Sequence, residues 1–210
     1  SPDYFNSCDT TSLSISSASV PSNFFGYQNA ATGNAYAGFF THVPYNPSNQ
    51  NEREWIESKL NSPLTIGTKY YISFKVSLAD SVNCATNNIG VLFSTDSLWY
   101  DVSVPLNNFT HFNYNTIITD TSNWTTILGT FISDSSYQYV MIGNFYADSL
   151  TDSIYYPNRP VSYWIDSTQC LAYYYIDDIE ICDSASCNPV TIEDNEILKN
   201  TITIYPNPAK

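Results

Sequence analysis

The sequence predicts an all-β fold, a two-sheet antiparallel β-sandwich of the jelly-roll type. Three observations support this prediction: short strand-like segments recur at regular spacing, turn residues separate them, and no segment shows a convincing helical period. Aromatic residues make up 16% of the 210 residues, far too many for a disordered chain. We therefore expect one jelly-roll domain over residues 1–186, followed by a tail.

In the first half of the chain, alternating polar and apolar residues predict strands separated by turns. The clearest alternation lies in 70–79, where every second residue is apolar and would face the core. Its antiparallel neighbour is expected to be 88–94, and the two prolines in 42–52 predict a loop. The strands expected in this half are 35–40, 53–60, 70–79 and 88–94.

The second half has the same alternation but also one long stretch without it. Residues 146–169 contain several aromatic residues around two prolines, and a long loop in a compact domain is usually functional or wraps the domain. The strands expected in this half are 115–118, 125–132, 138–145 and 173–182.

Residues 173–182 are apolar at nearly every position, which predicts a strand with both faces covered. Strict alternation would place Asp177 and Ile181 on one face, and Ile176 and Asp178 on the other. The two adjacent acids have two interpretations. They cap backbone N–H groups or meet solvent at an edge, or they bind a structural cation, for which calcium suits hard oxygen ligands.

Five cysteines leave at least one unpaired within the chain. If 171–182 is one straight strand, Cys170 and Cys182 lie too far apart to bond. A disulfide between Cys182 and Cys187, across a short turn, is therefore the local pairing we predict. A zinc site is not expected, because the sequence has no Cys/His cluster.

Charge and hydropathy restrict the partners. Lys and Arg total 7 against 20 Asp and Glu, a formal net charge of -13, so we expect no nucleic acid as a partner. No run of about 18 apolar residues predicts a membrane-spanning helix, so no membrane insertion is expected. The start at Ser1 does not resemble a signal peptide, which predicts a processed or fragmentary chain.

A family resemblance is carried by five segments in this order: REWIESKLNSPLTIGTKYYISFKVSLAD, NNIGVLFSTD, NWTTILGTF, YQYVMIGNF and YYYIDDIEIC. They resemble jelly-roll modules of surface and secreted proteins from Bacteroidetes bacteria, which are similar in architecture to carbohydrate-binding modules. The resemblance covers residues 1–182. It implies a protein that is extracellular or on the outer cell surface, and a glycan or cell-surface polysaccharide as its partner.

The C-terminal segment 203–210, TIYPNPAK, resembles the opening of the type A sorting domain of type IX secretion cargo. This implies the type IX secretion machinery as a partner during export. Residues 187–200 would then be a linker, and 201–210 the start of a truncated sorting domain or a donor-like strand. The alternative is a terminal strand ended by two prolines.

The resemblance also implies a strand before residue 1 that pairs near 173–182 and contributes an acidic residue to a cation site. Without it, we expect an open edge beside 173–182, and the calcium interpretation loses a ligand. Residues 200–205, of this chain or of a neighbouring copy, are able to complete the sheet. The result would be a strand-exchanged polymer, with copies of the chain as partners.

An aspartate, then Ser or Thr, then Ala, Ile, Leu, Val, Met or Thr resembles the O-glycosylation motif of the same bacteria. The alternative is that Asp-Ser pairs are ordinary turn chemistry. The residues that would carry glycans are Thr10, Ser81, Ser97, Ser149, Ser153, Ser167 and Ser184.

Two function hypotheses follow: an adhesive or glycan-binding protein, and a structural subunit of a filament or surface layer. Both use aromatic residues in the predicted loops, as sugar platforms or subunit contacts, although any one of them can simply pack onto the sandwich. The candidate ligand-binding residues are Trp99, Tyr100, Tyr155, Tyr156, Tyr163 and Trp164.

We do not expect an enzyme. His42 and His111 lie in no recognisable triad, and no catalytic motif is present. Glu52 and Glu54, with Arg53 between them, are interpreted as a solvated edge rather than as a pair of glycosidase carboxylates.

Overall fold

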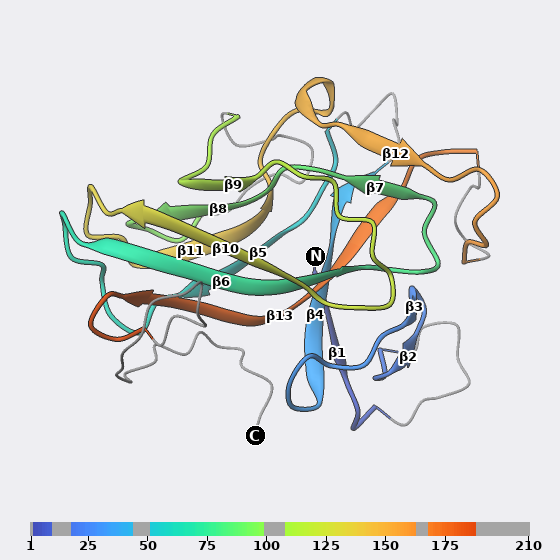
Figure 1. Ribbon diagram of the computed structural model, residues 1–210, viewed down its shortest axis with the longest axis horizontal. Coiled ribbons are helices and arrows are strands. Elements are labelled where there is room, and N and C mark those ends of the chain that lie inside the picture. The colour runs from blue at the N-terminus through green and yellow to red at the C-terminus, as the bar shows by residue number, and fades with distance from the viewer. Residues whose placement is uncertain (1, 10–17, 44–50, 99–107, 163–167, 188–210) are drawn as a thin grey trace, which may run out of the picture.

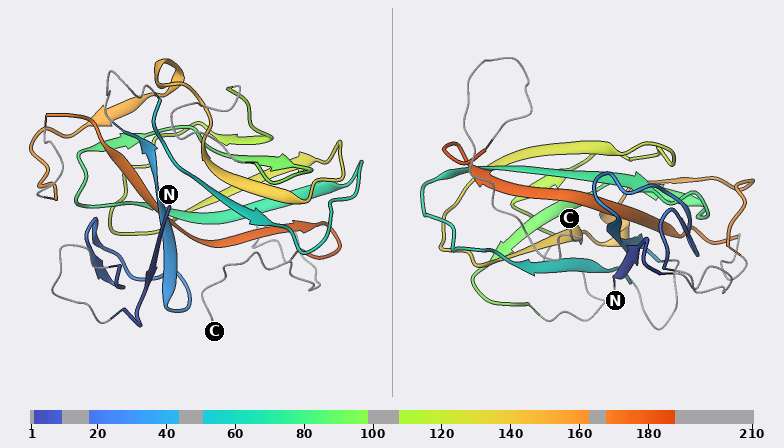
Figure 2. Two further views of the ribbon diagram at one scale, coloured as in Figure 1. Left: turned by 180° about the vertical axis from the view of Figure 1, so that it is seen from behind. Right: turned by 90° about the horizontal axis from the view of Figure 1, so that it is seen from below.

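Two antiparallel sheets pack face to face in the computed structural model, which describes residues 2–9, 18–43, 51–98, 108–162 and 168–187 (Figure 1). The right-hand view of Figure 2 shows the two layers from the side. One sheet consists of β1 (Asp3–Asn6), β4 (Ala35–His42), β13 (Ala172–Asp183), β6 (Lys69–Leu78) and β10 (Thr125–Ile132), in that order. The other consists of β5 (Trp55–Lys59), β11 (Tyr139–Asn144), β8 (Ile89–Ser94) and β9 (Phe112–Tyr114).

The path of the chain is that of a jelly roll. Among the strands of the two main sheets, the chain from β4 onward crosses to the opposite sheet at every step except between β8 and β9, and β13 returns to lie between β4 and β6. Two short pairs extend the sandwich, β2 (Ser22–Asn23) with β3 (Gly26–Tyr27) and β7 (Cys84–Thr86) with β12 (Ser153–Tyr155). The only helical element in the described residues is a 3-10 turn, η1 (Asp148–Leu150). The predicted fold class is confirmed.

Most predicted strands are present, but two expectations about them are wrong. The alternation in 70–79 is confirmed, because Ile72, Phe74, Val76 and Leu78 are almost fully buried. The predicted strand 88–94 exists as β8, but it pairs with β11 and β9 rather than with β6. The strand predicted at 115–118 lies earlier, as β9, because the chain has already turned at the exposed Asn115.

A β-bulge divides β13. The register with β6 shifts between Asp177 and Glu180, and Asp178 has a positive φ of 50°. The extra residue reverses the alternation, so Ile176 and Ile181 both face the sandwich core, where strict alternation would separate them. The predicted strict alternation along 173–182 is therefore wrong beyond Asp177.

The outer face of β13 is covered by a second aromatic layer. Tyr173 and Tyr175 point away from the sandwich core, yet both are almost fully buried. Phe25 stacks on Tyr173 with ring centroids 3.6 Å apart, and Phe5 meets Tyr175 edge to face at 5.6 Å. A Cβ at Gly38 would lie 2.3 Å from the Tyr173 hydroxyl oxygen, so this close approach requires glycine. The prediction that both faces of this strand are covered is confirmed.

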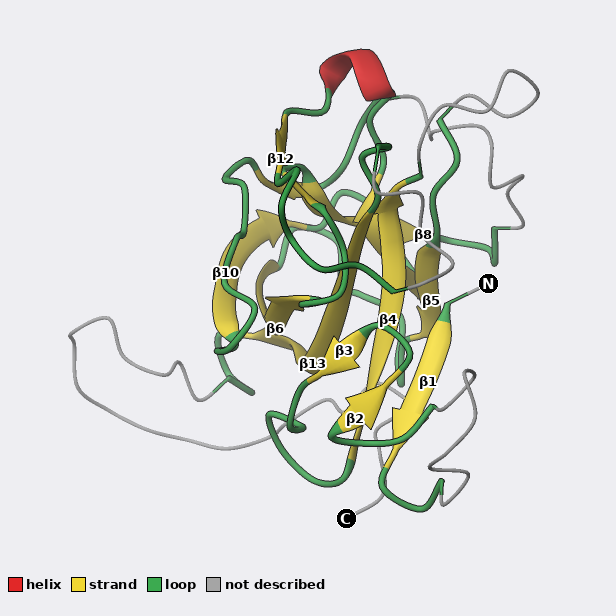
Figure 3. Cartoon of the chain, turned by 90° about the vertical axis from the view of Figure 1, so that its right-hand side faces the viewer, coloured by secondary structure: helices red, strands yellow, loops and turns green. Residues whose placement is uncertain are grey.

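The expectation of an open edge beside 173–182 is wrong for the first half of that strand. β4 pairs with Tyr173 to Ile176, and β6 pairs on the other side. The loop that precedes β4 then contacts Asp177 through the Ala31 N–H. Among the described residues, the outer strands of this sheet are β1 and β10, which Figure 3 shows on opposite sides of the molecule.

Candidate functional site

The structure describes two of the six candidate aromatic residues, Tyr155 and Tyr156, and they differ in exposure. Tyr155, the last residue of β12, is 42% exposed, and Leu150 and Ile154 beside it in sequence are 55% and 40% exposed. We call these three residues the β12 strip. The other four candidates, Trp99, Tyr100, Tyr163 and Trp164, lie outside the described residues.

Tyr156 supports the strip rather than extending it. The guanidinium carbon of Arg159 lies 4.0 Å from the centre of the Tyr156 ring, and the rest of the side chain packs against the core. The Tyr156 backbone N–H donates a hydrogen bond to the Asn83 carbonyl at 2.8 Å. The alternative interpretation, packing onto the sandwich, therefore holds for Tyr156.

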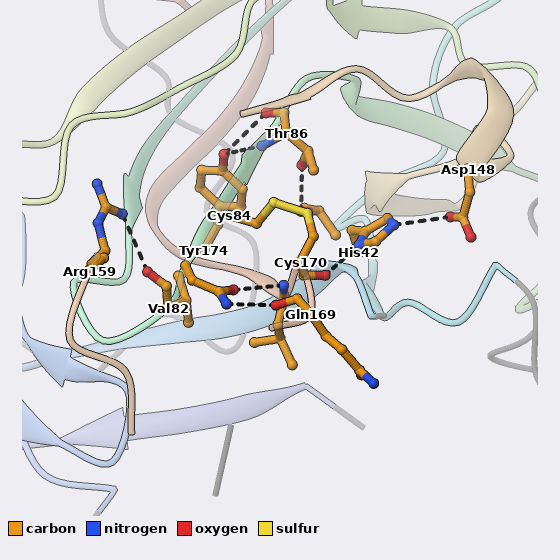
Figure 4. The surroundings of a disulfide bond; sticks show 12 residues. His42, Val82, Cys84, Thr86, Asp148, Arg159, Gln169, Cys170 and Tyr174 are labelled. Carbon is orange, nitrogen blue, oxygen red and sulfur yellow. Dashed lines mark hydrogen bonds and ion pairs between the residues drawn. A yellow bond between two sulfur atoms is a disulfide. The ribbon is translucent and has the colours of Figure 1, made fainter. Parts of the chain in front are cut away.

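A disulfide anchors the strand that carries Tyr155. Tyr155 pairs across the strands with Cys84, and Cys84 is bonded to Cys170, two residues before β13 begins (Figure 4). This bond was not predicted from the sequence, because the two cysteines are 86 residues apart and no local pattern joins them. It ties the β7–β12 pair to the main sheet.

Tyr174 also supports β7 from within the core (Figure 4). Its hydroxyl accepts a hydrogen bond from the Thr86 backbone N–H at 2.9 Å and lies 2.9 Å from the Ile118 carbonyl, to which it donates. Burial raises the pKa of the Tyr174 hydroxyl above its usual value, so this group is a neutral donor at any physiological pH.

Asparagine side chains hold the backbone that carries the strip. Asn87 exchanges two hydrogen bonds with Asp152, one to its carboxylate at 3.2 Å and one from its backbone N–H at 2.9 Å. Asn88 donates to the Leu150 carbonyl at 2.8 Å. These bonds replace the regular hydrogen bonds that a loop lacks, so η1 and the start of β12 have a defined conformation.

The prediction that Arg53 lies with Glu52 and Glu54 on a solvated edge is wrong, because Arg53 is fully buried. Its guanidinium forms an ion pair with Asp148 in η1 and donates to the Tyr146 and Asn51 carbonyls. Burial lowers the Arg53 pKa, and the Asp148 carboxylate opposes this effect. Arg53 was missed because an arginine between two glutamates normally lies in solvent.

The two histidines have structural partners. His42 Nδ1 donates to the Cys170 carbonyl at 2.9 Å (Figure 4). His111 Nδ1 accepts from the Phe93 N–H at 3.0 Å, so its Nε2 carries the proton and donates to Tyr137 at 2.9 Å. Burial lowers the pKa of His111, which favours this neutral form.

Asp177 and Asp178 serve the backbone and a lysine. The Asp177 carboxylate accepts from the Ala31 N–H at 2.8 Å and the Thr32 N–H at 3.3 Å, and from the Asp178 N–H at 2.8 Å. Asp178 forms an ion pair with Lys75 at 2.7 Å. These contacts support the backbone-capping interpretation. The described residues contain no group of three metal-ligating side chains, and calcium at this pair stays a prediction.

Burial raises the pKa of the Asp177 carboxyl, although the three N–H groups oppose the shift. The pair thus shows how a strand can hold two adjacent acids. One acid fastens the loop before β4 and the other neutralises a lysine on the neighbouring strand.

The predicted disulfide between Cys182 and Cys187 is present, with its sulfur atoms 2.01 Å apart. Cys8 is exposed and has no disulfide. Of the predicted glycosylation sites, Ser81 is half-buried, and Thr10 and Ser167 lie outside the described residues. The remaining sites are exposed: Ser97, Ser149, Ser153 and Ser184. The predicted linker and tail from residue 188 onward also lie outside the described residues.

Comparison with known proteins gives no family for this chain. Neither the family models nor the curated protein sequences contain a match. Among solved structures, one described as "PbXyn10C CBM APO" is 12% identical and covers 82% of this chain and 73% of its own, with a TM-score of 0.40. Another, "CBM4 structure and function", is 16% identical and covers 71% of each chain, with a TM-score of 0.37. Likeness at this level says nothing about the ligand of this chain.

No helix among the described residues is long and apolar enough to cross a membrane.

Proposed function

We propose that the chain is a non-catalytic module that binds glycans outside the cell, with the Tyr155 ring as a sugar platform. The observation that carries this proposal is an exposed aromatic ring on a short strand that a disulfide fastens to the main sheet. A tyrosine ring offers an apolar face to the C–H groups of a sugar. A fixed ring loses little conformational entropy when the sugar binds.

Polar groups around the strip supply the second half of a sugar site. Asp152 is exposed next to Ile154 and Tyr155, and its carboxylate can bond sugar hydroxyls. Two disulfides support an extracellular location, because such bonds persist in oxidising compartments. Export by a type IX-like route rests only on the resemblance of residues 203–210.

The Tyr155→Ala substitution is expected to weaken glycan binding at least about tenfold, since an aromatic contact contributes about 0.5–1.5 kcal/mol beyond its buried area. The measurement is a glycan array with the natural sequence, then titration calorimetry with the tightest ligand. Tyr27→Ala is the matched control, because Tyr27 is 55% exposed on β3, another short strand. The proposal fails if the natural sequence binds no glycan, or if both variants bind equally well.

We also propose O-linked glycans on the exposed Asp-Ser sites. Four exposed serines support this, because a transferase needs access to the hydroxyl. Intact-mass spectrometry of natively produced protein is expected to show added hexose-scale masses, and these should decrease when Ser149 and Ser153 are changed to alanine. The bare polypeptide mass would contradict the proposal.

A further inference from the structure

β10 forms one lateral edge of the five-stranded sheet (Figure 3). It is eight residues long and pairs with β6 over its whole length, from Thr125 opposite Val76 to Ile132 opposite Lys69. In the part of the chain that the structure describes, no strand pairs with its other side. An edge of this length is a template for another strand unless charge, proline or a bulge blocks it.

Hydrogen bonds at the two ends of the β6–β10 pair show which backbone groups face outward. At one end, the Ser133 N–H donates to the Thr68 carbonyl at 3.0 Å. At the other end, the Leu78 N–H points to the side of β6 on which β10 lies, and it donates to the Asp120 carbonyl. Hydrogen bonding alternates along an antiparallel strand, so the odd-numbered residues of β10 bond to β6. The residues that present N–H and C=O groups to the open edge are Thr126, Leu128, Thr130 and Ile132.

The same four residues have exposed side chains, with Leu128 50% and Ile132 66% exposed. The sequence of β10, TTILGTFI, contains no charge and no proline, and its register with β6 is unbroken. Three features that normally protect an edge strand, namely charge, proline and a bulge, are therefore absent from β10. Beside it, Lys75 of β6 is neutralised by Asp178.

A second copy of the chain matches this edge in charge and in pattern. Each copy carries a net charge of -13, so most pairs of faces repel, whereas two β10 edges bring no charges together. An antiparallel pair with its two-fold axis at Gly129 would place Leu128 opposite Thr130, and Ile132 opposite Thr126. Every outward backbone group would then gain a partner, and each contact would occur twice, as a two-fold interface requires.

We propose that two copies pair through β10 to form a continuous sheet across a symmetric dimer. This inference is independent of glycan binding, because β10 and the β12 strip belong to different sheets. Pairing would place two sugar platforms on one assembly, so avidity would strengthen binding to a polysaccharide.

The test is sedimentation velocity of the full chain over about two decades of concentration, since a dimer dissociates on dilution. We expect a monomer–dimer equilibrium that the double substitution Leu128→Lys, Ile132→Lys weakens at least about tenfold, because lysines of the two copies repel. The double substitution Tyr27→Lys, Ile66→Lys is the matched control, because it adds the same two positive charges at residues that are 55% and 65% exposed, and it should dimerise normally. Circular dichroism confirms that each variant is folded.

Amide hydrogen exchange provides a second measurement that needs no substitution. On concentration, exchange of the N–H groups of Thr126, Leu128, Thr130 and Ile132 should slow, and it should be fast in the dilute monomer. A monomer at all concentrations would overturn the proposal, as would a double-lysine variant that dimerises like the natural sequence. Slow exchange in the dilute monomer that is lost on deletion of 188–210 would also overturn it, by assigning the edge to the chain's own tail.

Discussion

Replacing both Cys84 and Cys170 with alanine is expected to lower the free energy of unfolding by about 4–5 kcal/mol. The bond joins residues 86 apart in sequence, so it removes much conformational freedom from the unfolded chain. Both ends are structural: Cys84 is fully buried in β7, and Cys170 leads into β13. The loss is large relative to the total stability of a typical domain.

The second disulfide supplies an internal control. Cys182 and Cys187 are only 5 residues apart, so the same chain-entropy argument predicts a loss of about 2 kcal/mol for their double alanine variant. Equilibrium unfolding in urea measures both variants against the natural sequence. Equal losses would contradict the loop-length argument. A loss near zero for the Cys84 and Cys170 pair would show that noncovalent packing alone holds β7.

The double alanine variant of Cys84 and Cys170 also tests how the proposed sugar site is held. Without the bond, β12 and Tyr155 lose their covalent link to β13 and are held by noncovalent contacts such as the short β7–β12 pairing and the asparagine hydrogen bonds. We therefore expect Tyr155 to lose more of its ligand affinity in that variant than in the Cys182 and Cys187 variant. The reason is that a ring with more freedom must be ordered when the sugar binds.

Alternation in the sequence predicted which faces of the strands are buried, but not which strands are neighbours. The inward residues of β6 are clear because one face is apolar, and β8 is recognisable for the same reason. Period-two patterns carry no information about the sheet to which a strand belongs, so β8 was assigned to the wrong partner. The bulge at Asp178 was hidden because a positive φ leaves only a weak mark on the sequence.

The candidate site was predictable only in part, for reasons that particular residues show. The aromatic stretch 146–169 pointed to a candidate loop, yet adjacent Tyr155 and Tyr156 lie differently in it, one exposed and one covered by Arg159. Exposure of a loop residue depends on contacts distant in sequence. The same holds for Arg53, whose partner Asp148 is 95 residues away.

Arg53→Met is expected to lower the free energy of unfolding by about 3 kcal/mol, because it breaks a buried ion pair and removes charged donors from its partners. Methionine retains the apolar stem, so the loss reports the guanidinium contacts. Asp148, 30% exposed, recovers some solvation, which limits the cost to the low end of the usual range. The carbonyls of Tyr146 and Asn51 lose donors as well.

Arg159→Met is the matched control, since Arg159 is the other arginine of the chain and its guanidinium lies over Tyr156 in a partly exposed site. Removing that contact should cost less than about 1 kcal/mol. Urea unfolding of the two variants gives the comparison, and equal losses would mean that burial of Arg53 contributes nothing special. Because Arg53 holds η1, whose last residue is Leu150 of the β12 strip, Arg53→Met should also weaken glycan binding. A loss of stability with unchanged binding would show that β7 alone positions Tyr155.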